Sequence, residues 1–100
     1  MARPTNKMRR IHPGELLRED MEELGLSARA LAEAIAVPHN RIAAILRGER
    51  SITADTALRL ATYFGTGADV WMNLQQDYDL KKAELESGAA IRAEIKRRVA

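Results

Sequence analysis

Apolar residues recur along this chain at the three- and four-residue spacing of amphipathic helices, and residues that start or stop helices separate the apolar groups. His12-Pro13-Gly14-Glu15 is expected to open the first helix, because proline suits a first turn and the acidic side chain faces the positive end of the helix dipole. Gly25 is expected to end that helix. Four more helices are expected to begin at Ser27, Pro38, Thr53 and Thr66.

No segment shows the alternation of a strand, so we expect an all-α fold of five helices in a compact globule with a C-terminal helical tail. Thr66-Gly67-Ala68-Asp69 has the spacing of a capping box for the fifth helix. Ser87-Gly88 is expected to break the helical pattern before a short tail helix containing Ile91, Ile95 and Val99. The buried stripes outside residues 27–48 are expected at Leu16, Leu17, Met21, Leu24, Ala57, Leu60, Ala61 and Phe64. The fifth helix carries Val70, Trp71, Leu74 and Tyr78.

Residues 27–48 are the most informative part of the chain. They predict two short helices joined by a tight turn, with Ser27 capping the first and Pro38 starting the second. Leu31, Ile35, Ile42, Ile45 and Leu46 form the inner faces, and Gly48 ends the second helix. This pattern is typical of a helix-turn-helix motif, whose second helix enters the DNA major groove. Two amphipathic helices of an unrelated bundle remain the alternative.

Charge is unevenly distributed along the chain, although the formal net charge is only +2. An acidic surface repels phosphate, so we expect the exposed face of the acidic first helix to point away from nucleic acid. The basic residues are Arg3, Lys7, Arg9 and Arg10 at the N-terminus, Arg41, Arg47 and Arg50 around the second motif helix, and Arg92, Lys96, Arg97 and Arg98 at the C-terminus. The acidic residues of the first helix are Glu15, Glu19, Asp20, Glu22 and Glu23.

Length and composition suit one small domain. We divide the chain into a basic flexible arm (1–11), a helix-turn-helix domain (12–84) and a C-terminal tail (85–100). The absence of cysteine excludes disulfides and thiolate metal sites. No apolar run approaches the roughly 20 residues of a membrane span, and no signal peptide is visible, so we expect a cytoplasmic protein without a membrane partner.

The order and spacing of four segments resemble the HigA-type antitoxins of bacterial toxin–antitoxin modules, which carry a phage-repressor-like (Xre-type) helix-turn-helix domain. The segments are residues 12–19 (HPGELLRE), 46–50 (LRGER), 52–61 (ITADTALRLA) and 71–80 (WMNLQQDYDL). The resemblance implies a homodimer that binds a palindromic operator in its own promoter and represses it. It also implies that the protein neutralises a HigB-type, mRNA-cleaving ribonuclease toxin. A stand-alone regulator, or an interaction module that has lost DNA binding, remains the alternative.

The resemblance also assigns base-reading positions to His39, Asn40, Arg41 and Ala44. Asn40 suits a bidentate contact with adenine, and the methyl group of Ala44 suits a thymine methyl. Arg41 suits either guanine or phosphate, and we favour phosphate because Arg41 lies toward the flank of the helix. The alternative for His39 is a solvated residue of the first turn.

Contacts with the DNA backbone are expected from Ser27 and the adjacent N–H group of Ala28, because helix N-termini attract phosphate. Arg47 and Arg50 are expected to reach the backbone from the far end of the motif, unless Arg50 pairs with Glu49 or another acidic neighbour. Pro38 stands where this fold commonly has Ser or Thr, so one hydroxyl contact with phosphate is missing.

Trp71, Leu74 and Tyr78 have two interpretations. They either close the core or form the dimer interface, where half-buried aromatic side chains are favoured anchors. We expect no enzyme, cofactor or metal site, because His12 and His39 are the only histidines, lie on different elements and have no cysteine nearby.

Overall fold

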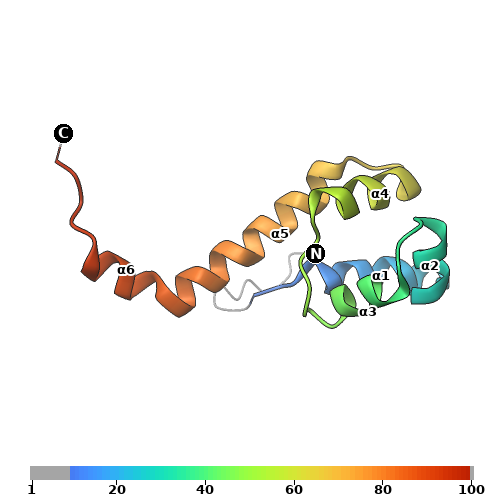
Figure 1. Cartoon of the computed structure of the whole chain (residues 1–100), viewed down its shortest axis with the longest axis horizontal. Coiled ribbons are helices and arrows are strands. Elements are labelled where there is room, and N and C mark those ends of the chain that lie inside the picture. The colour runs from blue at the N-terminus through green and yellow to red at the C-terminus, as the bar shows by residue number, and fades with distance from the viewer. Residues whose placement is uncertain (1–9, 100) are drawn as a thin grey trace.

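The computed structural model describes residues 10–99, which form helices and connecting loops with no strand (Figure 1). The all-α prediction is therefore confirmed for this part of the chain. Arg3, Lys7 and Arg9 of the expected basic arm lie outside the described residues. The elements are α1 (Pro13–Leu24), α2 (Ala28–Ala34), α3 (His39–Leu46), α4 (Ala54–Phe64), α5 (Ala68–Ala83), the π-helical turn η1 (Glu84–Gly88) and α6 (Ala89–Glu94).

Side-chain caps start three of the helices where the sequence predicts a start. Nδ1 of His12 accepts the N–H of Gly14 at 2.9 Å, and the Glu15 carboxylate accepts the His12 N–H, which completes a capping box. Ser27 Oγ accepts the N–H of Ala30 at 3.1 Å, and Thr53 caps α4 in the same way. Each cap satisfies an N–H group that the helix itself leaves without an acceptor.

The predicted capping box at Thr66-Gly67-Ala68-Asp69 is wrong. Gly67 is the N-cap of α5, and no side chain caps it. The reason is that the N–H of Thr66 donates to the carbonyl of Ala61, 3.0 Å away, so Thr66 is held in the turn that closes α4. Gly65 lies in the left-handed region at φ 74° and allows this turn to close.

The core lies where the inner faces of α1 to α5 meet, and α2 packs on α3. Its largest fully buried apolar side chains are Leu17, Leu31, Ile42, Ile45, Ile52 and Leu60. The expectation that Leu24 is buried is wrong, because it is 61% exposed and lines a surface groove together with Val70, which is 47% exposed.

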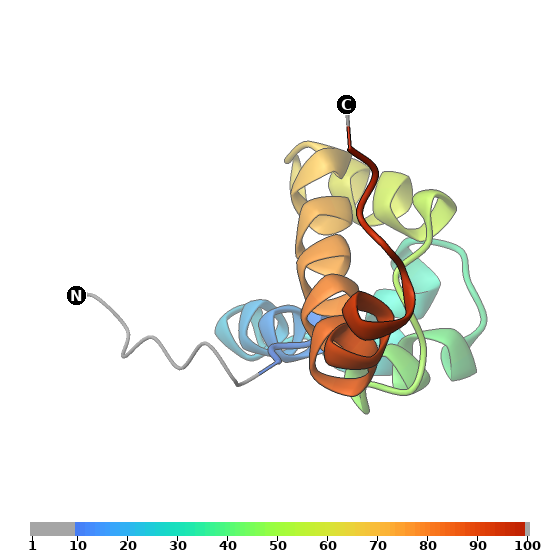
Figure 2. The ribbon, with the colours of Figure 1, turned by 90° about the vertical axis from the view of Figure 1, so that its left-hand side faces the viewer.

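The C-terminal helices run on without the expected break at Ser87-Gly88. Gly88 has helical dihedral angles (φ −57°, ψ −48°), and η1 carries the backbone from α5 into α6. The tail helix then ends at Glu94, so Ile95 and Val99 lie beyond the helix that was expected to contain them. Figures 1 and 2 show that α5 leaves the globule and that α6 lies at its far end. No helix among residues 10–99 has both the length and the apolar character needed to cross a bilayer.

Candidate nucleic-acid interface

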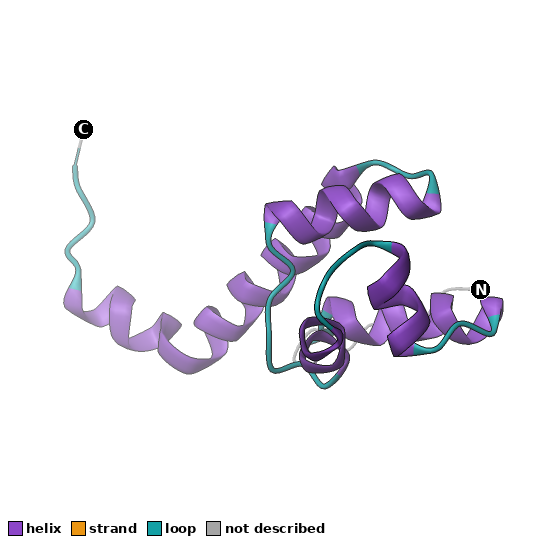
Figure 3. Ribbon diagram, turned by 45° about the vertical axis from the view of Figure 1, so that its right-hand side comes forward, coloured by secondary structure: helices purple, strands orange, loops and turns teal. Residues whose placement is uncertain are grey.

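The two motif helices form the expected helix-turn-helix, with α2 packed against α3 (Figure 3). The turn between them is tight: Ala36 has a positive φ of 58°, and the N–H of Val37 donates to the carbonyl of Ala32 at 3.0 Å. Ile42 and Ile45 anchor the inner face of α3 in the core with no exposed surface. The first turn of α3 therefore projects from a rigid base.

The residues assigned to base reading lie together on α3, with different accessibility. His39 and Asn40 are exposed in the first turn, and Ala44 is half-buried one turn further on. Neither the His39 nor the Asn40 side chain makes a hydrogen bond or ion pair with another described residue, so the polar atoms of both side chains are available to a ligand. The contacts of these side chains with individual bases stay a prediction.

Arg41 is already held by an acidic residue that the sequence analysis did not single out. Its Nη1 lies 3.3 Å from Oδ2 of Asp55 in the first turn of α4, and its side chain is 24% exposed. Its Nε is buried without a hydrogen-bond partner in the described part of the chain. The guanidinium group is thus restrained at the flank of α3, where sequence reasoning expected a phosphate contact.

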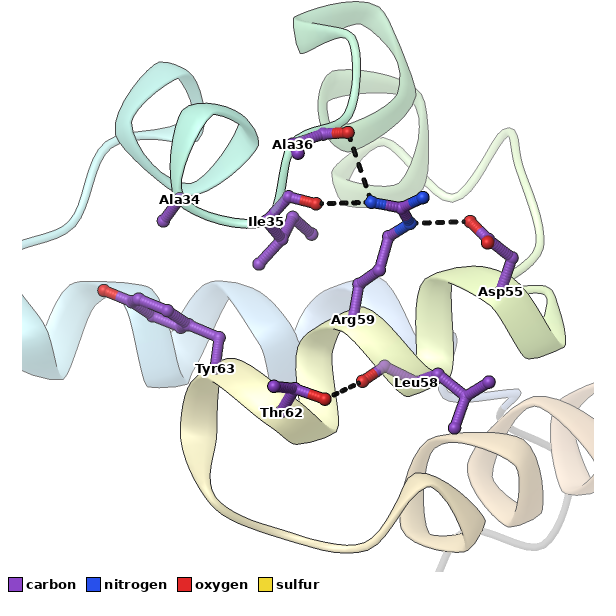
Figure 4. Close-up of a pocket in the computed structure, with 8 residues that line it drawn as sticks. All are labelled: Ala34, Ile35, Ala36, Asp55, Leu58, Arg59, Thr62 and Tyr63. Atoms are coloured by element: carbon purple, nitrogen blue, oxygen red, sulfur yellow. Dashed lines mark hydrogen bonds and ion pairs between the residues drawn. The ribbon is translucent and has the colours of Figure 1, made fainter.

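Arg59 connects the same carboxylate to the turn of the motif (Figure 4). Its Nε donates to Asp55 Oδ2 at 2.9 Å, and its Nη1 donates to the carbonyls of Ile35 at 3.0 Å and Ala36 at 3.3 Å. These carbonyls follow the end of α2, where the helix leaves acceptors unused. The hydrogen bond from Arg59, followed by the charges of Arg59 and Arg41, lowers the pKa of Asp55. Arg59 therefore fixes the turn that aims α3.

The residues expected to contact the DNA backbone lie at both ends of the motif. Ser27 is exposed and caps α2, and Ala28 begins that helix. Arg47 pairs with Glu49 at 3.0 Å, with both side chains more than half exposed. Arg50 makes no ion pair with another described residue, so the suggested Arg50–Glu49 pair does not form. Phosphate contact by these residues remains a prediction.

The start of α1 fixes the other end of α3. A Cβ atom added to Gly14 would lie 2.0 Å from the carbonyl oxygen of Ile45, so only glycine permits this close approach. The buried ring of His12 packs edge-on against Tyr78, with 4.8 Å between ring centroids. Burial lowers the pKa of His12, and hydrogen bonding with the Arg50 backbone opposes this shift. From the sequence, the only structural role predicted for His12 is in the start of a helix.

Trp71, Leu74 and Tyr78 lie on α5 with different degrees of burial, and the dimer contact expected of them stays a prediction. Trp71 is 4% exposed within the core, Leu74 packs against the core, and Tyr78 is half-buried beside His12. Gln75, which sequence reasoning missed, is also buried, and its Oε1 accepts the N–H of Ile52 at 2.8 Å. This hydrogen bond ties α5 to the loop after α3.

Within residues 10–99, no group of three or more His, Asp or Glu side chains has the arrangement of a metal site.

Comparison with known proteins identifies the motif. The sequence profile of the helix-turn-helix family matches residues 17–71. Virulence-associated protein I of Dichelobacter nodosus is 58% identical over 80 residues, which are 79% of this chain and 74% of that protein.

Two solved structures match nearly the whole chain. An addiction module antidote protein of the HigA family from Coxiella burnetii has a TM-score of 0.87 and 53% identity, covering 90% of this chain and 99% of that one. Pseudomonas aeruginosa antitoxin HigA, solved with the higBA promoter, has a TM-score of 0.88 and 43% identity, covering 91% of this chain and 100% of that one. The chain therefore belongs to the helix-turn-helix family and, within it, to the HigA-type antitoxins with a phage-repressor-like DNA-binding domain.

Proposed function

We propose that this chain is a dimeric autorepressor that binds a palindromic operator in its own promoter and neutralises a HigB-type, mRNA-cleaving ribonuclease. The observation that carries the DNA-binding part is the first turn of α3, where His39 and Asn40 are exposed on a rigid base. The antitoxin part rests on the similarity to an addiction module antidote protein and to an antitoxin solved with promoter DNA.

Base recognition in this proposal comes from the N-terminal half of α3. The amide of Asn40 pairs with N6 and N7 of adenine, His39 contacts the adjacent base edge, and Ala44 packs against a thymine methyl. Arg41 exchanges its exposed contact with Asp55 for a phosphate oxygen. Ser27, the N–H group of Ala28, Arg47 and Arg50 hold the DNA backbone and set the register.

A palindromic operator requires a second subunit whose α3 lies about 34 Å away, in the next major groove. Trp71 is occupied in the core, so we assign the dimer contact to the exposed apolar side chains of the protruding C-terminal helices. These are Leu80, Leu85 and Ile91, which are 61%, 42% and 46% exposed. Burying them against a second copy removes apolar surface from water.

One observation favours the alternative, an interaction module without DNA binding. Asp55 and Glu49 neutralise Arg41 and Arg47, two of the three arginines in and just after α3. Exposed ion pairs of this kind contribute only about 0–1 kcal/mol, so a phosphate group can replace the carboxylate. DNA binding with a steep salt dependence supports the repressor, whereas its absence at low salt supports the alternative.

The proposal is tested with the purified full chain and two ligands. A gel-shift titration compares DNA from upstream of its own gene with a shuffled fragment of the same length. An RNA-cleavage assay then measures whether the chain inhibits the ribonuclease encoded beside it. We expect a preference for the upstream fragment and stoichiometric inhibition. Equal affinity for both fragments contradicts the repressor, and uninhibited cleavage contradicts the antitoxin.

A further inference from the structure

A groove of about 310 Å³ lies between α1 and the start of α5, and we call it the acidic groove. It shares no lining residue with α2 or α3, so a ligand in it leaves the proposed base-reading side chains uncovered. Its lining residues are Leu16, Asp20, Glu23, Leu24, Phe64, Thr66, Val70, Trp71 and Leu74.

The lining of the acidic groove is mostly apolar. Leu24 and Val70 are 61% and 47% exposed, whereas Phe64 and Leu74 lie deeper and pack against the core. Trp71 also lines the groove, and its indole N–H has no acceptor in the described part of the chain. An apolar side chain of a partner that enters here removes both exposed side chains from water.

Two carboxylates, those of Asp20 and Glu23, line the acidic groove. Helix α1 as a whole exposes four carboxylates that make no ion pair with another described residue, and Arg18 is the only basic residue in the helix. The exposed charge of α1 therefore has the opposite sign to the +2 chain as a whole. It repels phosphate and attracts a cationic surface. The four residues are Glu19, Asp20, Glu22 and Glu23.

We infer that the acidic groove docks the cationic RNA-binding surface of the ribonuclease that this chain neutralises, an inference that rests on the proposed function. A ribonuclease binds a phosphate backbone and must therefore present Lys and Arg side chains around its active site. Asp20 and Glu23 complement those cations at the groove, and an apolar side chain at the edge of the ribonuclease enters between Leu24 and Val70. Neutralisation then follows from covering the surface that binds RNA, and the toxin and operator occupy separate faces.

The test uses the full chain and the ribonuclease encoded beside its gene. The variants are Asp20→Lys/Glu23→Lys, which reverses the rim charge, and Leu24→Glu, which places a charge in the groove. Glu94→Lys on α6 is the control for charge, and Leu58→Glu is the control for apolar loss because Leu58 is also 61% exposed. Association and dissociation rates with the ribonuclease are measured at low and high salt, and operator affinity is measured in parallel.

We expect the double charge reversal to slow association at least about tenfold at low salt and to reduce its salt dependence. Leu24→Glu is expected to speed dissociation about tenfold, because a charge is then desolvated in the groove. The controls keep wild-type rates, and all variants keep wild-type operator affinity.

Three results would overturn the inference or its basis. Wild-type rates in both groove variants overturn the inference and leave the antitoxin role intact. A change of oligomeric state in Leu24→Glu also overturns it, since the groove is then an interface between copies of this chain. No binding of the ribonuclease by the wild-type chain refutes the antitoxin role itself.

Discussion

Replacing Arg59 by Ala should loosen the turn that aims the recognition helix. The variant removes the hydrogen bonds to the carbonyls of Ile35 and Ala36 and the ion pair with Asp55. Ala36 is then left in a left-handed conformation that alanine adopts at a cost and that no other side chain among residues 10–99 holds by a hydrogen bond. The first turn of α3 follows this turn directly, so its orientation becomes less defined.

The magnitude follows from the contacts. A hydrogen bond to a charged group contributes about 1.5–3 kcal/mol when it is buried. The Arg59 side chain is 40% exposed, and its exposed ion pair with Asp55 contributes little. We therefore expect the free energy of unfolding to fall by about 1–3 kcal/mol and the preference for operator over random DNA to fall as well.

The assay combines urea unfolding with gel-shift titration on operator and shuffled DNA. Arg59→Lys should recover part of the preference, because an ammonium group still donates to one of the carbonyls. Arg92→Ala is the matched control, because Arg92 also pairs with a carboxylate, that of Glu84, but on the protruding helices. Wild-type unfolding and wild-type operator preference in Arg59→Ala would refute the bracing role.

Three further predictions concern single side chains. Asn40→Ala should weaken operator binding by about 1–3 kcal/mol while leaving binding to shuffled DNA unchanged in a gel-shift titration. Arg47→Gln should instead weaken binding to both DNAs alike and lower the slope of log affinity against log salt by about one. Burial lowers the pKa of His12 below 6.5, so its contribution to stability is complete above pH 6.5 and declines as the pH falls below this value. Urea midpoints at about pH 7.5 and about pH 5.5 test this, and His12→Asn, which keeps a capping side chain, should show a smaller difference between them.

The sequence predicts the local part of this fold well, because its signals are local. Ser27 and Thr53 cap the helices that follow them, and Gly25 and Gly48 adopt the left-handed conformation that ends a helix. The inner face of α3 is also visible in the sequence, since Ile42 and Ile45 recur at helical spacing and are fully buried. That periodicity leaves His39 and Asn40 on the outer side of the helix, and the resemblance to the HigA-type antitoxins assigns them to base reading.

The parts that sequence reasoning missed depend on contacts between distant residues. Asp55 looks like an ordinary acidic residue in a first turn, and only the packing of α4 brings it to Arg41. The hydrogen bond from Arg59 to the carbonyl of Ile35 joins two residues that are 24 positions apart in the sequence. No periodic pattern of residues predicts such a contact. Leu24 extends the apolar stripe of α1, yet it lies at a groove that only the tertiary structure reveals.

The central claim, that the first turn of α3 reads base edges, is tested most directly by selecting bound duplexes from a random DNA pool. The wild-type chain should select an inverted repeat with half-sites about one helical turn apart. Asn40→Ala should select the same repeat with preference lost at one position of each half-site. An unchanged motif with Asn40→Ala, or no motif with the wild-type chain, would contradict the claim.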